Sequence, residues 1–189
     1  MKGRRAVGAH IQVTVNSLPS INPAIDGDAT GSDALQFRQG MSRVAAAVHV
    51  VTTDGPAGRA GFTASAVAPV TDAPPTLLVC INASGRSAEA LKTNAVFCVN
   101  ALAFEDSAIS DVFAGRSDLN GADRFEVGAW EPLVTGAPAL VSSLVSFDCR
   151  LADAQLLATH HIVIGEILAI RMGQSRAALI YQGRAYRRL

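Results

Sequence analysis

The sequence predicts a mainly β protein, a closed barrel of six or seven antiparallel strands with two or three short helices. Short runs of β-branched and apolar residues alternate with turn-forming residues, as is typical of antiparallel strands. Two such runs flank Asp54-Gly55-Pro56-Ala57-Gly58 and therefore predict a hairpin. No Gly-x-Gly-x-x-Gly motif occurs, so a doubly wound parallel sheet with a dinucleotide crevice is disfavoured.

Residues 1–33 combine basic residues with prolines and glycines, and they lack the apolar stretch of a signal peptide. We expect a flexible N-terminal arm at 1–33, followed by one domain at 34–189. A short edge strand from His10 to Val15, where apolar and polar residues alternate, is the alternative for part of the arm. Ser32 or Asp33 is predicted to cap a helix that leads into the barrel.

Three strands are predicted between residues 46 and 87: Val48 to Thr53, Ala60 to Val67, and Thr76 to Ile81. The second carries small or hydroxyl side chains where a packing strand would carry large ones. This composition indicates that something other than protein side chains fills the space beside it.

A helix from Ala88 to Asn94 and a strand from Val96 to Leu102 are expected next, with Asn94 as the helix stop. A second helix follows from Ala108 to Ala114. Residues 116–138 are rich in turn formers, and their composition predicts an ordinary loop with one strand at Trp130. Three further strands should close the barrel: Leu144 to Leu151, His161 to Ile170, and Ala178 to Tyr181.

The composition excludes several classes of function. Lys+Arg and Asp+Glu are both 16 in the 189 residues, so no basic surface for nucleic acid is expected. No apolar run approaches the ~20 residues of a membrane span. Cys80, Cys98 and Cys149 are widely spaced in apolar contexts, which favours reduced thiols in a cytoplasmic protein over disulfides or a metal site.

Five segments follow, in order, the pattern of a known family: GRAGFTASAV, PPTLLVCIN, Phe97-Cys98-Val99-Asn100, LVSFDCR, and Thr159-His160 with Gly165. Over residues 34–189 the chain resembles the flavin reductases. This resemblance implies an FMN-binding split barrel of Greek-key topology. It also implies a homodimer that uses NADH to reduce FMN for a partner monooxygenase, of the pyrimidine-utilisation or 4-hydroxyphenylacetate type.

The resemblance assigns Thr63, Ala64, Ser65 and Ala66 to the flavin, whose polar ring edge would lie along their backbone and hydroxyl groups. Asn82 would contact the ribityl or pyrimidine side. The alternative for this strand is ordinary alternation of buried alanine with exposed threonine and serine.

Ser84, Arg86 and Ser87 stand at the predicted start of a helix, where two hydroxyls and a guanidinium can bind a phosphate. The alternative is simple N-capping by Ser87 beside a solvated Arg86.

A lone histidine before an apolar strand is usually structural, but the resemblance gives His160 a place beside the flavin and the nicotinamide. It also adds Gly165 and Tyr186 to the cofactor-binding residues, and it places residues 116–138 over the cofactor side or near the subunit contact. His161 should point to the opposite side of the strand.

The predicted function is therefore reduction of FMN by NADH, in which the cofactors supply the reactivity and the protein aligns them. Two alternatives are a non-catalytic flavin- or haem-binding split-barrel protein and a self-contained flavin oxidase.

Overall fold

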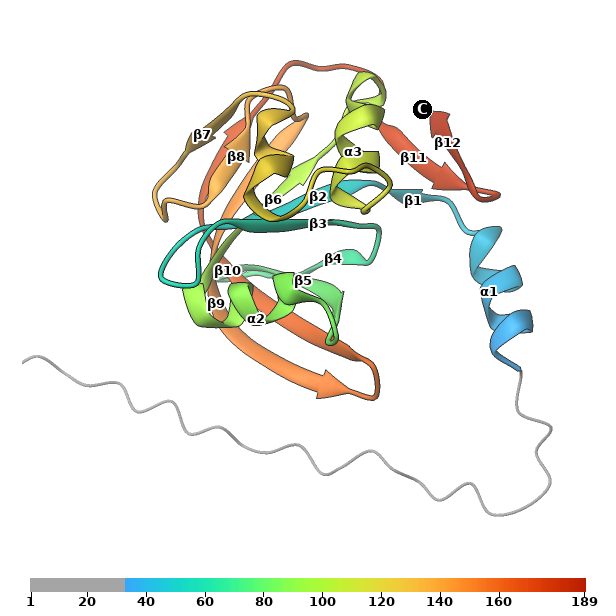
Figure 1. Cartoon of the computed structure of the whole chain (residues 1–189), viewed down its shortest axis with the longest axis horizontal. Helices are drawn as coiled ribbons and strands as arrows, with labels where there is room; N and C mark the ends of the chain where they lie inside the picture. Colours follow the sequence, from blue (N-terminus) through green and yellow to red (C-terminus); the bar gives the residue numbers. More distant parts are fainter. Residues whose placement is uncertain (1–32) are drawn as a thin grey trace, which may run out of the picture.

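The computed structural model of the protein describes residues 33–189. The expected arm, apart from Asp33, and the alternative strand from His10 to Val15 lie outside the described residues. The described part contains one large antiparallel sheet, two small sheets and short helices (Figure 1). The predicted fold class, mainly β and antiparallel, is confirmed.

The large sheet has seven strands, and every neighbouring pair in it is antiparallel. In spatial order the strands are β3 (Ala60–Ala64), β2 (His49–Thr53), β6 (Val96–Ala101), β9 (Val145–Leu157), β10 (His160–Met172), β5 (Pro75–Asn82) and β4 (Val67–Asp72).

The two edges of this sheet, β3 and β4, are consecutive in the chain and are joined by Ser65 and Ala66 alone. Ala64 and Val67 are three residue steps apart and can be separated by at most ~10 Å, so the edges must lie close together and the sheet must curl into a barrel. Because β3 and β4 do not pair with each other, the barrel wall is open between them. We call this opening the seam.

The prediction of one strand from Ala60 to Val67 is wrong, because that segment contributes to both edges of the seam. Its first part pairs with β2, whereas Val67 pairs with Val79 of β5. One straight strand cannot follow both partners, so the chain turns at Ser65. The predicted hairpin of β2 and β3 is confirmed.

The remaining strands form two small sheets. They are β1 (Ala46–Ala47), β11 (Leu179–Gln182) and β12 (Ala185–Arg188) in one sheet, and β7 (Trp130–Pro132) and β8 (Pro138–Leu140) in the other. The sequence prediction lacks β1, β8 and β12, whereas β7 matches the single strand at Trp130 that was the alternative for residues 116–138.

The helices are short: α1 (Ala34–Ser42), α2 (Arg86–Asn94) and α3 (Ser107–Phe113), with 3-10 turns η1 (Phe104–Asp106) and η2 (Gly121–Glu126). The predicted cap of α1 is confirmed, since the Asp33 side chain accepts a hydrogen bond from the Gln36 N–H at 2.6 Å. Helix α1 buries none of its residues and projects from the barrel (Figure 1). No helix in residues 33–189 is long and apolar enough to cross a membrane.

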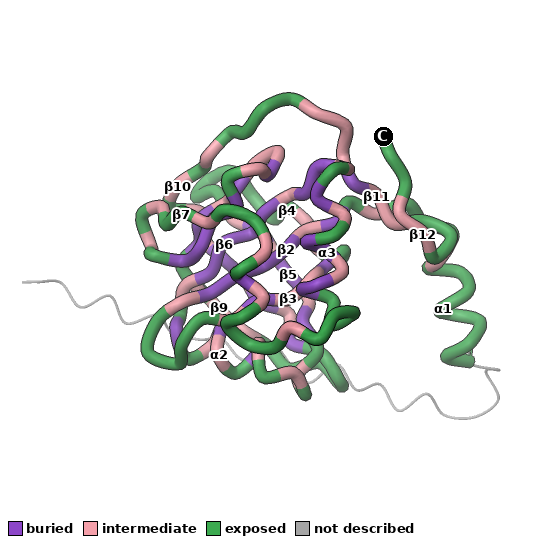
Figure 2. The backbone as a smooth tube through the Cα atoms, turned by 45° about the horizontal axis from the view of Figure 1, so that its top comes forward, coloured by how far each residue is buried: buried purple, intermediate pink, exposed green. Residues whose placement is uncertain are grey.

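Two hydrophobic cores lie on opposite faces of β2, and buried residues accordingly run through the centre of the molecule (Figure 2). Val51 points into the barrel with Val79, Phe97 and Val163, whereas Val50 points to the second core under α3. Both valines are 0% exposed, as expected for a strand covered on both faces.

Helix α2 ends as the sequence predicts, although the reversal falls on the residue after Asn94. Asn94 is the last helical residue, and Ala95 takes the left-handed conformation with φ 57°. The Asn94 side chain instead holds the hairpin turn: it accepts from the Ala57 N–H at 2.8 Å and donates to the Gly58 carbonyl at 2.9 Å. Helix α2 and the turn after β2 are therefore fixed to each other.

All three cysteines are free, as expected for reduced thiols. Burial raises the pKa of the Cys149 thiol to about 12 and also raises the pKa of Cys98, so both stay protonated and unreactive. Cys80 differs from them because it is only half-buried.

Candidate functional site

A cavity of about 410 Å³ opens at the seam, and we call it the seam cavity. It is lined by Phe62, Thr63, Ala64, Ser65, Ala66, Cys80, Ile81, Asn82, Gly85, Ser87, Phe113, Ala114 and His160. Most of the predicted site residues meet here, although they come from β3, β5, α2 and β10.

The β3 side of the seam cavity is a strand edge. Within residues 33–189, β3 has a sheet neighbour only in β2, so its other edge presents backbone N–H and C=O groups. Ser87 Oγ donates to one of these, the Gly61 carbonyl, at 3.1 Å. Ala64 and Ala66 add little bulk, so a planar polar ligand can approach this backbone closely.

Asn82 and His160 are directly opposite each other on paired strands. Asn82 Oδ1 accepts from the Ser84 N–H at 2.9 Å and from its hydroxyl at 2.8 Å. This leaves the Asn82 amide donors for a ligand. His160 is exposed, and its Nδ1 lies 2.9 Å from the Thr159 hydroxyl, so Nε2 is free to meet a ligand in the cavity.

Helix α3 supplies the opposite wall through Phe113 and Ala114. A Cβ atom at Gly61 would lie only 2.6 Å from Phe113 Cε1, so glycine there allows α3 to approach β3. The Thr63 hydroxyl donates to the Ser110 carbonyl at 2.7 Å and is thereby committed to holding α3. Of the two hydroxyls expected to meet the flavin, only that of Ser65 has no hydrogen-bond partner in the described part of the chain.

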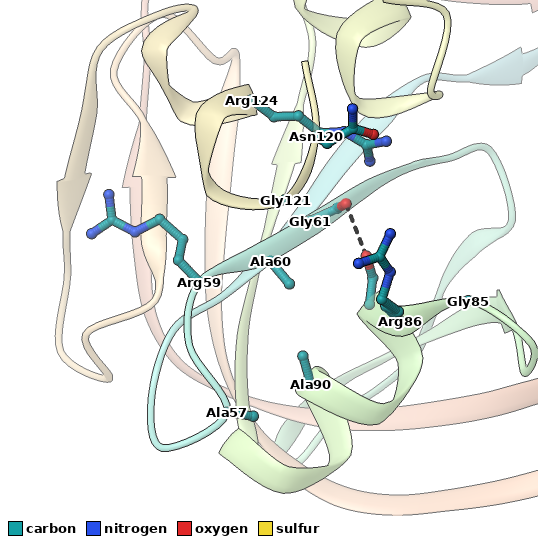
Figure 3. Close-up of a pocket in the computed structure, with 11 residues that line it drawn as sticks. Ala57, Arg59, Ala60, Gly61, Gly85, Arg86, Ala90, Asn120, Gly121 and Arg124 are labelled. Atoms are coloured by element: carbon teal, nitrogen blue, oxygen red, sulfur yellow. Dashed lines mark hydrogen bonds between the residues drawn. The ribbon is translucent and has the colours of Figure 1, made fainter. Parts of the chain in front are cut away.

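A second cavity, of about 380 Å³, adjoins the first, and Gly85 and Ser87 line both. We call it the arginine cavity (Figure 3). Its lining comprises Ala57, Arg59, Ala60, Gly61, Gly85, Arg86, Ser87, Ala90, Asn120, Gly121 and Arg124.

The three residues predicted to bind a phosphate are close together in the sequence, but their side chains lie in different places. Arg86 lines the arginine cavity and Ser87 lies where the two cavities meet. Ser84 lines neither, because its hydroxyl is turned to Asn82. The alternative of N-capping by Ser87 is wrong: Gly85 is the N-cap of α2, and the Ser87 hydroxyl bonds to Gly61 instead.

Tyr186 lies next to the seam cavity, not in it. It lines a third cavity of about 270 Å³ that shares Thr63, Ser65 and Ala114 with the first. Its hydroxyl is 2.8 Å from Ser110 Oγ and donates to Asp111 Oδ1 at 2.9 Å. Burial raises the pKa of the Tyr186 phenol, so the hydroxyl stays protonated and keeps this contact.

Gly165, which the family resemblance assigns to the cofactor, lies away from the three cavities. Gly165 is paired with Leu77 inside the barrel wall and lines none of the three cavities. The position a Cβ atom would take is occupied by the ring of Phe97. Glycine is needed here because the core residue Phe97 fills the space of its side chain.

Sequence reasoning missed several lining residues. Cys80 could have been found, since it is two residues from Asn82 on β5 and therefore points to the same side. Phe113 and Arg124 lie 19 and 30 residues beyond Asn94, the end of α2, and no local pattern links them to the β5–α2 region. Their positions follow only from the packing of α3 and η2 against β3.

Comparison with known proteins shows which family the chain is similar to. Residues 41–189 match the model of the flavin reductase like domain. The chain is 49% identical over 151 residues to the FMN reductase (NADH) RutF of Ancylobacter novellus, which covers 80% of this chain and 82% of that protein.

Solved structures of similar fold belong to the same group. A flavin reductase crystal structure from Haemophilus somnus has a TM-score of 0.80 at 43% identity and covers 84% of this chain and 100% of its own. BorF, the flavin reductase component of a bacterial two-component tryptophan halogenase, has a TM-score of 0.77 at 28% identity and covers 83% and 98%.

Proposed function

We propose a mechanism from the premise that this chain belongs to the flavin reductase family. The protein is an NADH-dependent FMN reductase that supplies reduced flavin to a partner enzyme. The observation that supports this activity in the structure is the seam cavity. Residues distant in sequence line it together, and one of its sides is a polar strand edge.

The flavin ring occupies the seam cavity in this proposal, with its polar edge along the backbone from Thr63 to Ala66. Exposed strand-edge N–H and C=O groups, with the Ser65 hydroxyl, match the donors and acceptors of the pyrimidine side of the ring. The amide of Asn82 donates to the ribityl chain or the pyrimidine. Support comes from the edge position of β3 and the small side chains along it.

The phosphate lies at the junction of the two cavities, near Ser87, with Arg86 supplying the positive charge. Ser87 can contact it once its hydroxyl turns from the Gly61 carbonyl. The start of α2 contributes N–H groups and the favourable end of the helix dipole. Ser84 acts indirectly, since it orients the Asn82 amide.

His160 contacts the nicotinamide, because it lies across β5 and β10 from Asn82 at the open side of the cavity. When bound, NADH supplies the hydride and FMN accepts it. The residues that line the seam cavity would contribute by orienting the two rings toward each other. No acid or base is required of His160 for this step, only orientation.

Consumption of NADH by the purified full-length chain is expected to depend on added FMN, and to continue through many equivalents of FMN per protein. A flavin-binding module without catalysis would bind FMN and leave NADH unchanged. A self-contained oxidase would instead consume oxygen with an organic substrate and no NADH. Absorbance at the NADH band, with and without FMN, separates the three outcomes.

Replacing Arg86 by alanine is expected to weaken FMN binding about tenfold or more, because a charge-assisted bond to phosphate contributes ~1.5–3 kcal/mol. Riboflavin, which has no phosphate, should bind the wild type and the variant alike. Quenching of flavin fluorescence measures both affinities. Equal affinity of the wild type for riboflavin and FMN would remove the phosphate site from the proposal.

The partner is a flavin-dependent monooxygenase that takes up the released reduced flavin, and the protein works as a homodimer in the cytoplasm. The dimer is supported by α1, whose Leu35, Phe37 and Met41 are each more than half exposed. Residues 34–189 form the single domain of this dimer, and sedimentation equilibrium of the full chain measures its mass directly.

A further inference from the structure

The hydroxyl of Tyr186 connects the last strand of the chain, β12, to α3. It lies 2.8 Å from the Ser110 hydroxyl and donates to Asp111 Oδ1 at 2.9 Å. Because a phenol carries one hydrogen, which Asp111 receives, the Ser110 hydroxyl is the donor in the other contact. Arg116 donates to the same Asp111 oxygen at 2.9 Å, and its guanidinium lies 5.9 Å from the centre of the Tyr186 ring. One phenol oxygen therefore holds two successive residues of α3.

Ser110 also connects α3 to both sides of the seam cavity. It is 0% exposed, and its carbonyl accepts from the Thr63 hydroxyl at 2.7 Å and from the Ala114 N–H at 2.9 Å. Thr63 belongs to the strand-edge side of the cavity, and Ala114 belongs to the opposite wall. Since Tyr186 binds the Ser110 hydroxyl, one buried residue links β12, α3 and β3 through hydrogen bonds.

Helix α3 depends on such contacts for its position. It has seven residues, whereas isolated helices shorter than ~12–15 residues are marginal in water. In the described part of the chain, only Thr63 and Tyr186 connect α3 to a strand through side-chain hydrogen bonds. Phe113, which lines the seam cavity, packs against Gly61, and glycine offers the ring only backbone to pack on. The bonds at Ser110, one turn earlier, therefore restrain how far this wall stands from β3.

We propose that Tyr186 is a positioning residue: its hydroxyl, acting through α3, fixes Phe113 and Ala114 relative to β3 and so sets the width of the seam cavity. The inference rests on the proposed function, in which the flavin ring occupies that cavity. A flat ring keeps one orientation only between walls at a fixed spacing, and hydride transfer requires such alignment. The side chain that the family resemblance assigns to the cofactor thus acts on the ring without touching it.

Two variants remove the two ends of one hydrogen bond. Tyr186→Phe removes the phenol oxygen and keeps the ring, and Ser110→Ala keeps the carbonyl that Thr63 uses. Each should weaken riboflavin and FMN binding by the same factor, at least about threefold, and lower kcat/KM for NADH at saturating FMN at least about fivefold. The double variant should match Tyr186→Phe, because both changes remove the same contact. The equal effect on the two flavins separates this wall from the phosphate site, where Arg86→Ala weakens FMN alone.

Tyr181→Phe is the matched control. Tyr181 is paired with Tyr186 across β11 and β12, and the two ring centroids are 5.8 Å apart. Among residues 33–189, its hydroxyl has no hydrogen bond to α3. Because Tyr181→Phe removes no bond that holds the wall, flavin affinities and NADH kinetics should stay within about twofold of the wild type.

All affinities and rates are compared at a temperature where circular dichroism shows every variant to be folded. The proposal is overturned if Tyr186→Phe lowers kcat/KM for NADH and Ser110→Ala does not, because Tyr186 would then contact a cofactor directly. It is also overturned if both variants lose thermal stability but keep wild-type affinities and kinetics. Failure of the proposed function is distinguishable, since the wild type itself would then not oxidise NADH with FMN.

Discussion

Alanine in place of His160 is expected to lower kcat/KM for NADH at least tenfold, ~1.4 kcal/mol of transition-state stabilisation, while FMN affinity stays within about threefold. The imidazole lines the open side of the seam cavity, opposite Asn82, and its Nε2 has no partner among residues 33–189. Its loss removes orientation of the nicotinamide but no contact to the flavin phosphate. Steady-state rates at saturating FMN, with FMN affinity from fluorescence quenching, measure the two quantities.

His161 provides the matched control for this variant. It is only 7% exposed and points to the barrel interior, away from the seam cavity. His161→Ala should therefore reduce stability but leave kcat/KM for NADH within about twofold at a temperature where both variants are folded. If His160→Ala and His161→Ala give the same kinetics, His160 has only a structural role.

Valine in place of Gly165 is expected to lower the free energy of unfolding by at least ~3 kcal/mol, or to prevent folding. The added Cβ atom would overlap the Phe97 ring, whose Cε1 atom would lie 2.9 Å away, and would lie 3.1 Å from Cys149 Cβ. Phe97 is 0% exposed inside the barrel and has no free space to move into. Urea denaturation, monitored by circular dichroism, measures the decrease in the free energy of unfolding.

A second substitution tests whether the clash with Phe97 is the cause. Phe97→Leu combined with Gly165→Val should recover part of the lost stability, because the smaller side chain makes room for valine. Gly40→Ala, in α1 with no atom within 4 Å of the added Cβ, should be neutral or stabilising by ~1 kcal/mol. If the double variant is no more stable than Gly165→Val alone, another contact must account for the loss.

The sequence was informative wherever one local pattern decided the structure. The turn formers after Thr53 predict the β2–β3 hairpin, and Asp33 predicts the start of α1, because each signal acts over a few residues. Thr63 to Ala66, Asn82 and His160 were identified by family resemblance, and the structure places them around one cavity.

Features that depend on distant partners were not predictable in this way. No glycine or proline marks a break in the sequence at Ser65. Strand β3 ends before it only because the next strand, β4, pairs with β5 instead of β2. Gly165 matches a family pattern, yet only the packed position of Phe97 shows what that glycine is for. Arg124 enters the arginine cavity through the path of η2, which no periodicity in the sequence reveals.

The seam also bears on how this site tolerates change over evolutionary time. In the proposed binding mode, recognition along β3 would rely on main-chain groups at the edge of the sheet, and these groups are present whatever residue occupies the position. Substitutions from Ala64 to Ala66 are therefore limited by the volume of the new side chain more than by its chemistry. In the proposed binding mode, the amino acids of this segment can differ between relatives while the seam cavity still accepts a flat ligand.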